Sequence, residues 1–486
     1  MDLSILYRQD LKGLIETPSL TTNVVNFVLE TFDNIGLQGQ LARGITIPYC
    51  NALFLPFYAS NLNMPIEIEK ILTSEAVGLA PGGKNVSLSL AIFGAMGEAL
   101  ERALAVLHSQ RLRVYGLKSG DIIFGAYKEL SKEYNLIGPD EIQFFHPKQF
   151  EDPYMPYEQF TDDTKISWVR GYRLLRGEEV YFPAQYACLG YRGIFDEKPI
   201  AYSTSSGLAA SPDFHQSIYK GILETIERDI ALLHWVSMTP PIVVNASKDL
   251  LLGLLDDFDY LLNNRGFELK LYYFMGDIPG IHTVMAVIIS KKFKYFKYVS
   301  GICADISLIE AIKGAMLEAF QAQVLVYFIH TVLKVFGRHS TYYYVEKDAS
   351  SRQITNIFQS MFYWGYPENL SKLCSTFLAS EKSIKIEDLE EESLVSEHAT
   401  IKTKLAKLLD ILRTNNIDPI VINQTPKEVS EKAYVLRIII PELVFHYSSS
   451  MPFFGHRRYQ IAPKILRGEE RQLKFDEYNT LPLPFP

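Results

Sequence analysis

The sequence lacks the short motifs that mark several large enzyme classes. It contains no GxxxxGK[ST] loop, no GxGxxG fingerprint followed by an acidic residue, no GxSxG elbow and no HExxH pair. Each of these motifs fixes a backbone geometry or a ligand spacing that its chemistry requires. Their absence argues against P-loop nucleotidases, Rossmann dehydrogenases, serine hydrolases and zinc peptidases.

Cysteine is scarce, and no targeting or membrane segment is visible. The chain has four cysteines and no CxxC pair, so neither a disulfide framework nor a zinc site is expected. The N-terminus has no basic stretch followed by an apolar one, which argues against a signal peptide. The apolar run Val324–Phe336 is too short for a membrane span and is interrupted by His330 and Lys334. A cytoplasmic protein without membrane insertion is predicted.

An excess of basic residues is also missing. The net charge of −8 gives no general reason to bind nucleic acid or an anionic membrane. Hydrophobic residues make up 48% of the 486 positions and charged residues 21%, which is ordinary for a globular protein with a large core. Function must therefore be sought in local patterns.

The most informative stretch runs from Ser205 to Asp229. A glycine-bearing loop leads into a predicted helix on which Glu224, Glu227 and Arg228 share one face, because they lie three and four residues apart. Carboxylates and an arginine on an otherwise apolar helix suggest a bound cation or polyanion, since unpaired burial of such groups is costly. A surface ion-pair cluster explains this helix alone equally well.

Repetition decides against the surface cluster. Glu98, Glu101 and Arg102 repeat the ExxER pattern after Gly82-Gly83-Lys84, which is interpreted as a glycine turn with a lysine that can meet a phosphate. A weaker copy has Ser300-Gly301 before Glu318 and Gln321, at the spacing that separates Ser206-Gly207 from Glu224. Three helices with acidic residues in one register predict a shared site, and such carboxylates suit Mg²⁺ in contact with nucleotide phosphates.

The rest of the chain predicts an α+β fold, in which the repeated glycine-led helices pack on mixed or antiparallel sheets. Residues 1–70 are interpreted as a variable N-terminal segment, and 71–486 as one ATP-binding domain. Residues 340–425 suggest a solvated helical insertion with an acidic run. A helix is expected over Leu250–Asn263. The expected strands are a hairpin or meander over Ile166–Leu189, with turns at Gly171 and Arg176-Gly177, and four further segments: Glu268–Met275, Thr283–Ile289, Asp418–Asn423 and Ala433–Ile440.

The chain ends in a proline-rich tail at 482–486, Pro-Leu-Pro-Phe-Pro. Alternating prolines hold such a segment extended and leave it little conformational entropy to lose on docking. A mobile terminus or a ligand for a proline-binding domain is the plain alternative. A stiff tail is better suited to reach into a cleft and deliver the carboxylate of Pro486.

Taken together, these segments resemble the YcaO superfamily from about Ala76 to Pro486, and the tail resembles the PxPxP ending of its azoline-forming members. Weaker matches lie at 168–171, 437–443 and Arg458-Tyr459. The resemblance implies an ATP- and Mg²⁺-dependent cyclodehydratase. Such an enzyme turns Cys, Ser or Thr residues of a ribosomally made precursor peptide into thiazolines or oxazolines, by phosphorylating the backbone amide oxygen.

The resemblance also assigns roles to residues of this chain. It implies a catalytic terminal carboxylate at Pro486, which would assist as general base. The implied ATP-binding residues are Lys84, Glu98, Arg102, Ser206, Arg228 and Gln321. The implied metal ligands are Glu101, Gln216, Glu224, Glu227 and Glu318.

Three positions depart from the family pattern, and one of them is Gln323, which stands where an arginine is frequent just after the third motif. Gly94 stands where members often have serine, and Gln216 where they usually have glutamate. An amide ligates a metal without bringing negative charge, so metal affinity falls or one metal is lost. These departures keep open a catalytically weak scaffold that binds nucleotide or peptide within a modification complex. ATP-dependent thioamide or amidine formation is the nearest rival chemistry, and the tail argues against it.

Residues 1–70 do not resemble a complete leader-binding domain. The resemblance therefore implies a separate partner protein that recognises the leader of the precursor peptide. A flavin-dependent dehydrogenase can then oxidise azolines to azoles, and a homodimer is compatible with the resemblance. No nucleic-acid partner is expected.

Overall fold

A computed structural model describes residues 45–46, 58–62, 82–85, 88–246, 266–291, 296–336, 343–386, 389, 399–426 and 433–486. The predicted helix at 250–263 lies outside these residues, as do nearly all of the predicted acidic run at 387–397 and most of segment 1–70. The division of the chain into an N-terminal segment and an ATP-binding domain stays a prediction.

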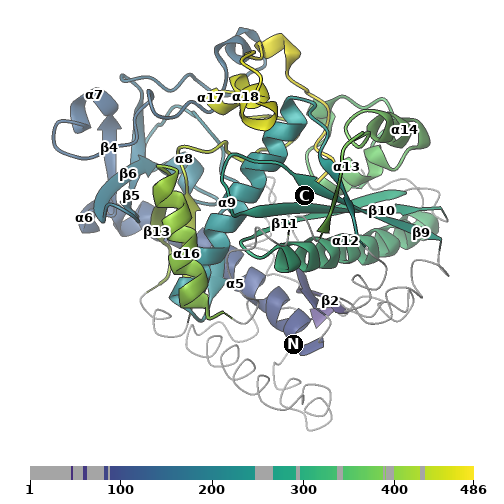
Figure 1. Ribbon diagram of the computed structural model, residues 1–486. Coiled ribbons are helices and arrows are strands. Elements are labelled where there is room, and N and C mark those ends of the chain that lie inside the picture. Colours follow the sequence, from purple (N-terminus) through teal and green to yellow (C-terminus); the bar gives the residue numbers. More distant parts are fainter. Residues whose placement is uncertain are drawn as a thin grey trace.

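Two larger sheets and one small one carry the described fold (Figure 1). One sheet has the order β4-β5-β13-β14-β7, with β6 paired to β5, and is antiparallel throughout. Its strands are β4 (Ile122–Ala126), β5 (Lys165–Arg173), β6 (Glu178–Pro183), β7 (Leu208–Ser211), β13 (Ile420–Asn423) and β14 (Tyr434–Ile439). The predicted strands near 420 and 435 are therefore confirmed.

The second sheet has the order β11-β10-β9-β8-β12 and is mixed, because β12 pairs with β8 in parallel. Its strands are β8 (Ile242–Asn245), β9 (Phe267–Phe274), β10 (His282–Ser290), β11 (Tyr298–Asp305) and β12 (Ser383–Lys385). The small sheet joins β1 (Ile45–Thr46), β2 (Tyr58–Leu62) and β3 (Gly82–Asn85). The α+β class with mixed and antiparallel sheets is confirmed.

The three repeated helices each follow a strand. They are α5 (Leu88–Arg111) after β3, α9 (Phe214–Val236) after β7, and α12 (Leu308–Phe336) after β11. Asp213 caps α9 by accepting hydrogen bonds from the backbone N–H groups of His215 and Gln216. In Figure 1, α12 lies against the sheet of β9, β10 and β11, and α9 stands between the two larger sheets.

Two glycine interpretations are wrong in detail. Gly82-Gly83 belongs to strand β3 and not to a turn. Ser300-Gly301 likewise lies within a strand, β11. Gly171 lies inside β5, where a Cβ would come within 2.9 Å of side-chain carbons of Ile420 and Ile422 on the neighbouring strand. The turn of this hairpin uses Gly177, whose φ of +69° is left-handed.

The segment at 340–425 is less solvated than predicted. It contains α13 (Ile357–Trp364), α14 (Pro367–Ser375) and α16 (Ile401–Thr414), but also strand β12. Helix α13 is buried along most of its length, and Trp364 is 1% exposed. Helix α16 packs Leu408 and Leu412 against Ile222 of α9. These helices form part of the main fold, because their apolar faces complete two hydrophobic clusters.

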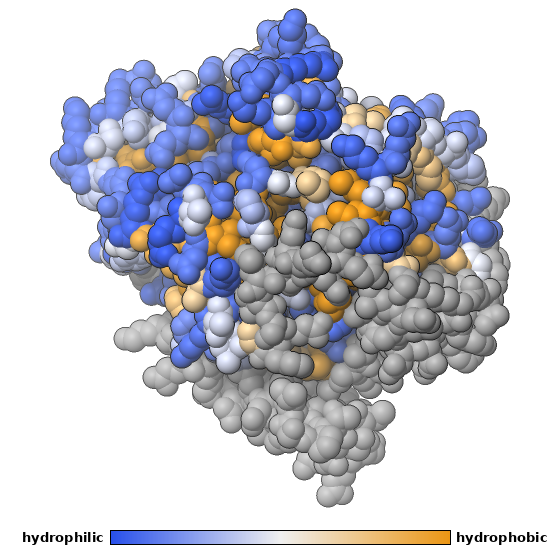
Figure 2. Space-filling model, viewed as in Figure 1, coloured by the Kyte–Doolittle hydropathy of each residue, from blue (hydrophilic) through white to orange (hydrophobic). Residues whose placement is uncertain are grey.

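The remaining short helices are α6 (Leu117–Ser119), α7 (Tyr127–Leu130), α8 (Ala184–Ala187), α17 (Arg457–Gln460) and α18 (Ala462–Arg467). Hydrophobic residues on the face drawn in Figure 2 are seen mainly in its recesses, whereas the projecting parts are hydrophilic. Among the described residues, no helix is both long and apolar enough to cross a bilayer.

Candidate active site

Two of the repeated helices hold their leading glutamate in the same way. The Glu98 carboxylate on α5 accepts a hydrogen bond of 2.9 Å from the backbone N–H of Gly82 in β3, sixteen residues earlier. The Glu318 carboxylate on α12 accepts one of 2.9 Å from the N–H of Ile302 in β11, also sixteen residues earlier. The repeat seen in the sequence is therefore a repeat of geometry, with each acid tied to the strand of its own unit.

Glycine is required where these strands meet their helices. A Cβ on Gly83 would lie 1.7 Å from the Ala91 carbonyl oxygen of α5, and one on Gly301 would lie 2.4 Å from the Ala319 nitrogen of α12. Both overlaps involve backbone atoms, which cannot move aside as a flexible side chain can. The glycines of the repeat thus allow the close approach that brings a strand N–H to a helical carboxylate.

The second unit joins its neighbours through Glu227. Its carboxylate accepts a hydrogen bond of 3.2 Å from the N–H of Ala304 in β11, and lies 3.5 Å from the Nε atom of Arg228. Similarly, Arg102 Nη2 lies 3.1 Å from Glu98 Oε1, and Arg102 Nε lies 3.6 Å from Glu101 Oε1. Lys84 Nζ lies 3.4 Å from Glu318 Oε1. The carboxylates are thus matched by cations from two units, Lys84 and Arg102 of the first and Arg228 of the second.

Burial dominates the electrostatics of these acids. It raises the pKa of Glu101 to about 8, against the opposing effect of Arg102. Burial likewise raises the pKa of Glu224 and of Glu227, although Arg228 favours the charged form of both. Groups perturbed in this way cluster at functional sites, because burial and close charges set the pKa values that catalysis and ligand binding require.

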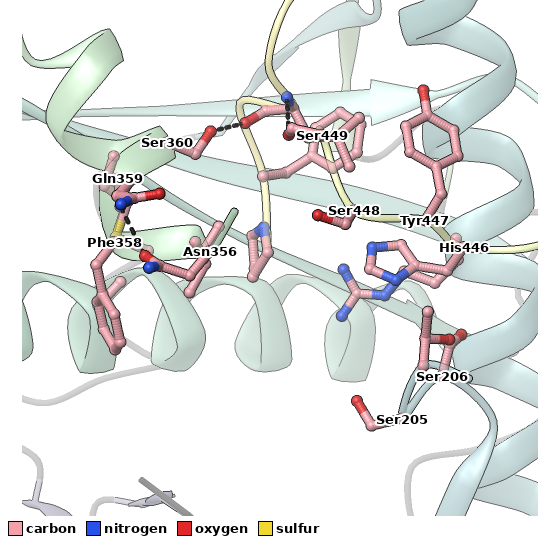
Figure 3. A pocket seen from close by; sticks show the side chains of 18 of the residues that line it. Ser205, Ser206, Asn356, Phe358, Gln359, Ser360, His446, Tyr447, Ser448 and Ser449 are labelled. Carbon is pink, nitrogen blue, oxygen red and sulfur yellow. Dashed lines mark hydrogen bonds between the residues drawn. The ribbon is translucent and has the colours of Figure 1, made fainter. Parts of the chain in front are cut away.

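A cavity of about 820 Å³ opens over this cluster (Figure 3). Its lining includes most of the residues to which the sequence assigns a role: Lys84, Glu98, Arg102, Ser206, Glu224, Arg228, Glu318, Gln321 and Pro486. Glu101, Glu227 and Gln216 are not among the lining residues. The Gln216 amide oxygen accepts a hydrogen bond of 3.0 Å from Ser211 Oγ. The individual roles of all these residues stay predictions.

The proline-rich tail enters the cavity from the side of the second sheet. Tyr298 and Ser300 of β11 donate hydrogen bonds of 2.8 and 2.7 Å to the Pro484 carbonyl. Phe485 is 1% exposed, and Pro486 lines the cavity. The tail therefore reaches into a cleft, as its sequence predicts.

Successive carbonyls of the tail have side-chain donors. Ser351 donates to the carbonyl of residue 480, Trp235 to 481, Trp364 to 482 and Ser360 to 483. Ser449 accepts a hydrogen bond of 3.0 Å from the N–H of Leu483. A proline-rich chain cannot satisfy itself by pairing, because its prolines have no N–H, so these side chains fix its path.

Sequence reasoning missed two parts of the wall. One is the segment 354–361 at the start of α13, which carries no charged side chain and therefore gave no signal. The other is His446, whose Nε2 atom is buried without a hydrogen-bond partner. Burial, together with Arg228 and Arg437, lowers the pKa of His446 well below its usual range, so the imidazole is neutral at pH 7. In the sequence, His446 belongs to no spacing pattern that would mark it as a site residue.

The donor set fits a nucleotide triphosphate with Mg²⁺. The Nη1 atoms of Arg102 and Arg228 are buried without a hydrogen-bond partner, as expected of donors that await anionic oxygens. Within the part of the chain that the structure describes, no three His, Cys, Asp or Glu side chains gather closely enough to hold a metal alone. Mg²⁺ commonly uses one or two carboxylates together with substrate phosphates, which this cavity can provide.

Comparison with known families agrees with this chemistry. Residues 82–444 match the model of a family described as YcaO cyclodehydratase, ATP- and Mg²⁺-binding. The chain belongs to the YcaO family. The membership confirms the resemblance seen in the sequence and the expected cofactors, ATP and Mg²⁺. No curated protein sequence matches this YcaO chain.

Solved structures share the fold at low sequence identity. A heterocyclase in complex with substrate and cofactor superposes with a TM-score of 0.70 at 18% identity, over 98% of this chain and 60% of that one. YcaO from Methanopyrus kandleri, bound with AMPPCP and Mg²⁺, gives 0.58 at 16% identity, over 88% and 94%. The E. coli microcin synthetase McbBCD complex gives 0.52 at 17%, over 88% and 93%. This YcaO chain thus spans about three fifths of the first heterocyclase.

Proposed function

We propose that this YcaO protein is an ATP-dependent cyclodehydratase that forms thiazolines or oxazolines in a ribosomally made precursor peptide. The observation that carries the proposal is the seating of the PxPxP tail, with Pro486 lining the same cavity as Lys84, Arg102 and Arg228. A phosphate-binding set and a terminal carboxylate in one cavity suit a reaction that joins phosphoryl transfer to proton removal.

In the proposed reaction, the side-chain sulfur or oxygen of a Cys, Ser or Thr residue attacks the preceding carbonyl carbon and loses its proton. The former carbonyl oxygen takes the γ-phosphoryl group of ATP, and ADP leaves. The bond between carbon and this oxygen then breaks, the amide nitrogen loses its proton, and the C=N bond of the azoline forms as phosphate departs. The net change in the peptide is the loss of one water.

The residues of this chain supply positioning and charge. Arg102 and Arg228 can neutralise phosphate oxygens with their unpartnered Nη1 groups, and Lys84 can do so once it exchanges Glu318 for a phosphate. Mg²⁺, when bound, would neutralise charge on the transferred phosphoryl group, with Glu98, Glu224 and Glu318 as cavity-lining candidates to hold it. The carboxylate of Pro486 is proposed to accept the proton of the attacking group.

The partners are also proposals. The E. coli microcin synthetase has been solved as a complex with its pro-peptide, pro-MccB17. By analogy, we infer that this YcaO chain works with a precursor peptide and a separate leader-binding protein. A flavin-dependent dehydrogenase, a homodimer and a cytoplasmic location stay predictions.

One reconstitution tests the proposed function. The protein is mixed with the leader-binding protein and precursor encoded beside it, ATP and Mg²⁺, and the peptide is weighed. Successive losses of one water each, matched by released phosphate, are expected. An unchanged peptide mass with intact nucleotide binding would favour the catalytically weak scaffold. A mass change other than water loss would favour thioamide or amidine formation.

A further inference from the structure

The cavity has two ends of different chemistry. Its charged end is built by the three repeated units and holds the lysine, the two arginines and three of the glutamates. Its other end is lined by residues 354–361 and by Leu325 of α12, none of which carries a full charge at pH 7. In Figure 3, Asn356, Phe358 and Gln359 lie on one side, and Ser205, Ser206 and His446 on the other.

Helix α12 connects the two ends and sets their separation. Glu318 and Gln321 line the charged end, whereas Leu325 lies two turns beyond Glu318. Seven residues of α-helix advance about 10 Å along the axis, more than the width of a phosphate group. The neutral end thus lies beyond the cations that would meet the phosphates, and it is open either to the nucleoside or to a second molecule.

The tail enters the cavity beside the neutral wall. Ser360 of α13 donates a hydrogen bond to the carbonyl of Leu483, and Leu483, Phe485 and Pro486 all line the cavity. In the proposed function, the oxygen of the reacting amide must reach the γ-phosphate, and the attacking side chain must reach the carboxylate of Pro486. The precursor residues that flank the reacting amide must then extend away from the cations, because the phosphates of the nucleotide occupy the charged end.

We propose that residues 354–361 form the subsite for the precursor residues that flank the reacting amide, and that this subsite selects uncharged ones. The proposal rests on the proposed function, since it takes the peptide as second substrate. It also gives a role to the segment 340–425, from which this wall comes. Ile354 is fully buried and Phe358 nearly so, which keeps the wall rigid, while Thr355 is exposed and faces the cavity.

The exposure of Thr355 makes a charge-swap test feasible. Its hydroxyl donates to the Gln359 amide oxygen at 3.1 Å, so Thr355→Asp and Thr355→Lys remove one partly buried hydrogen bond, while the backbone N–H of residue 355 still donates to that oxygen at 2.8 Å. Thr376→Asp is the matched control, because Thr376 is exposed in the same segment, donates one hydrogen bond of 2.7 Å and does not line the cavity.

The probes are fluorescein-labelled synthetic peptides of glycine and alanine around one cysteine, with lysine or glutamate next to it. Their affinities for each protein, saturated with a non-hydrolysable ATP analogue and Mg²⁺, are measured by anisotropy. Thr355→Asp is expected to shift the ratio of the two affinities by about tenfold toward the lysine peptide, and Thr355→Lys to shift it toward the glutamate peptide. The Thr376→Asp protein should keep the wild-type ratio.

Two results would overturn the subsite. One is an equal ratio in all four proteins. The other is a tenfold loss of affinity for the ATP analogue in Thr355→Asp, which would place the nucleotide base at the neutral end. Because anisotropy needs no turnover, these results are separate from the failure of the proposed function, which would be seen as missing water loss in the wild-type reconstitution.

Discussion

Adding one glycine after Pro486 is expected to abolish most of the turnover without weakening the affinity for ATP. The side chains that hold the tail carbonyls of residues 480–484 and the buried Phe485 keep the tail in its present register. An added residue moves the terminal carboxylate by about 3.5 Å, which exceeds the margin of a hydrogen bond. Loss of a general base costs about 10²- to 10⁴-fold in rate.

The assay follows phosphate release and peptide mass under single-turnover conditions, with affinity for an ATP analogue measured in parallel. Pro486→Ala is the matched control, because it changes the ring but keeps a terminal carboxylate at the same place. This variant should retain activity within about tenfold of wild type, which is a smaller loss of rate than removal of a general base causes. A glycine-extended protein that turns over within threefold of wild type would refute the role of the carboxylate.

Three further outcomes are expected. If Glu101 holds the metal, as the resemblance implies, its carboxyl, whose pKa is raised to about 8, must lose a proton before Mg²⁺ binds. Mg²⁺-dependent ATP binding should then strengthen about tenfold per pH unit up to pH 8, and calorimetry at pH 6 to 8 checks this, a flat profile placing Glu101 outside the metal site. Gln216→Glu should strengthen the same binding if residue 216 holds metal, whereas an unchanged affinity would place it outside the metal site. Gly301→Ala should destabilise the fold by about 1–3 kcal/mol through its 2.4 Å approach to Ala319, whereas Gly97→Ala, with open space around it, should stabilise α5 by about 0.5–1 kcal/mol, both measured by urea unfolding.

Helical periodicity made much of the site predictable. Charged residues three and four apart must share a helix face, and their repetition at one spacing after glycine indicated a common centre. The structure brings Glu98, Glu224 and Glu318 to one cavity from three helices. The sequence could not reveal that Glu98 is tied to a strand, because the two successive glycines Gly82-Gly83 favour a turn by local propensity, and only the packing of helix α5 explains the strand.

The neutral wall was beyond sequence reasoning for a different reason. Residues 354–361 carry no charge and no motif, and they join the site only because α13 packs beside β11 and the tail. The sequence predicts a solvated segment that includes α13, whereas Phe358 and Met361 of this helix are buried. Tertiary contacts decide such cases, since a short uncharged segment has no sequence pattern that separates a cavity wall from the core.

The tail contacts also bear on how the chain folds. Trp235 and Leu481 are 246 positions apart, yet a hydrogen bond joins them, and Ser300 meets Pro484 across 184. Contacts over such distances form late and slowly, because the intervening chain must be ordered first. We therefore expect the cavity to be among the last parts to assemble, and nucleotide affinity to report whether the whole chain has reached its native topology.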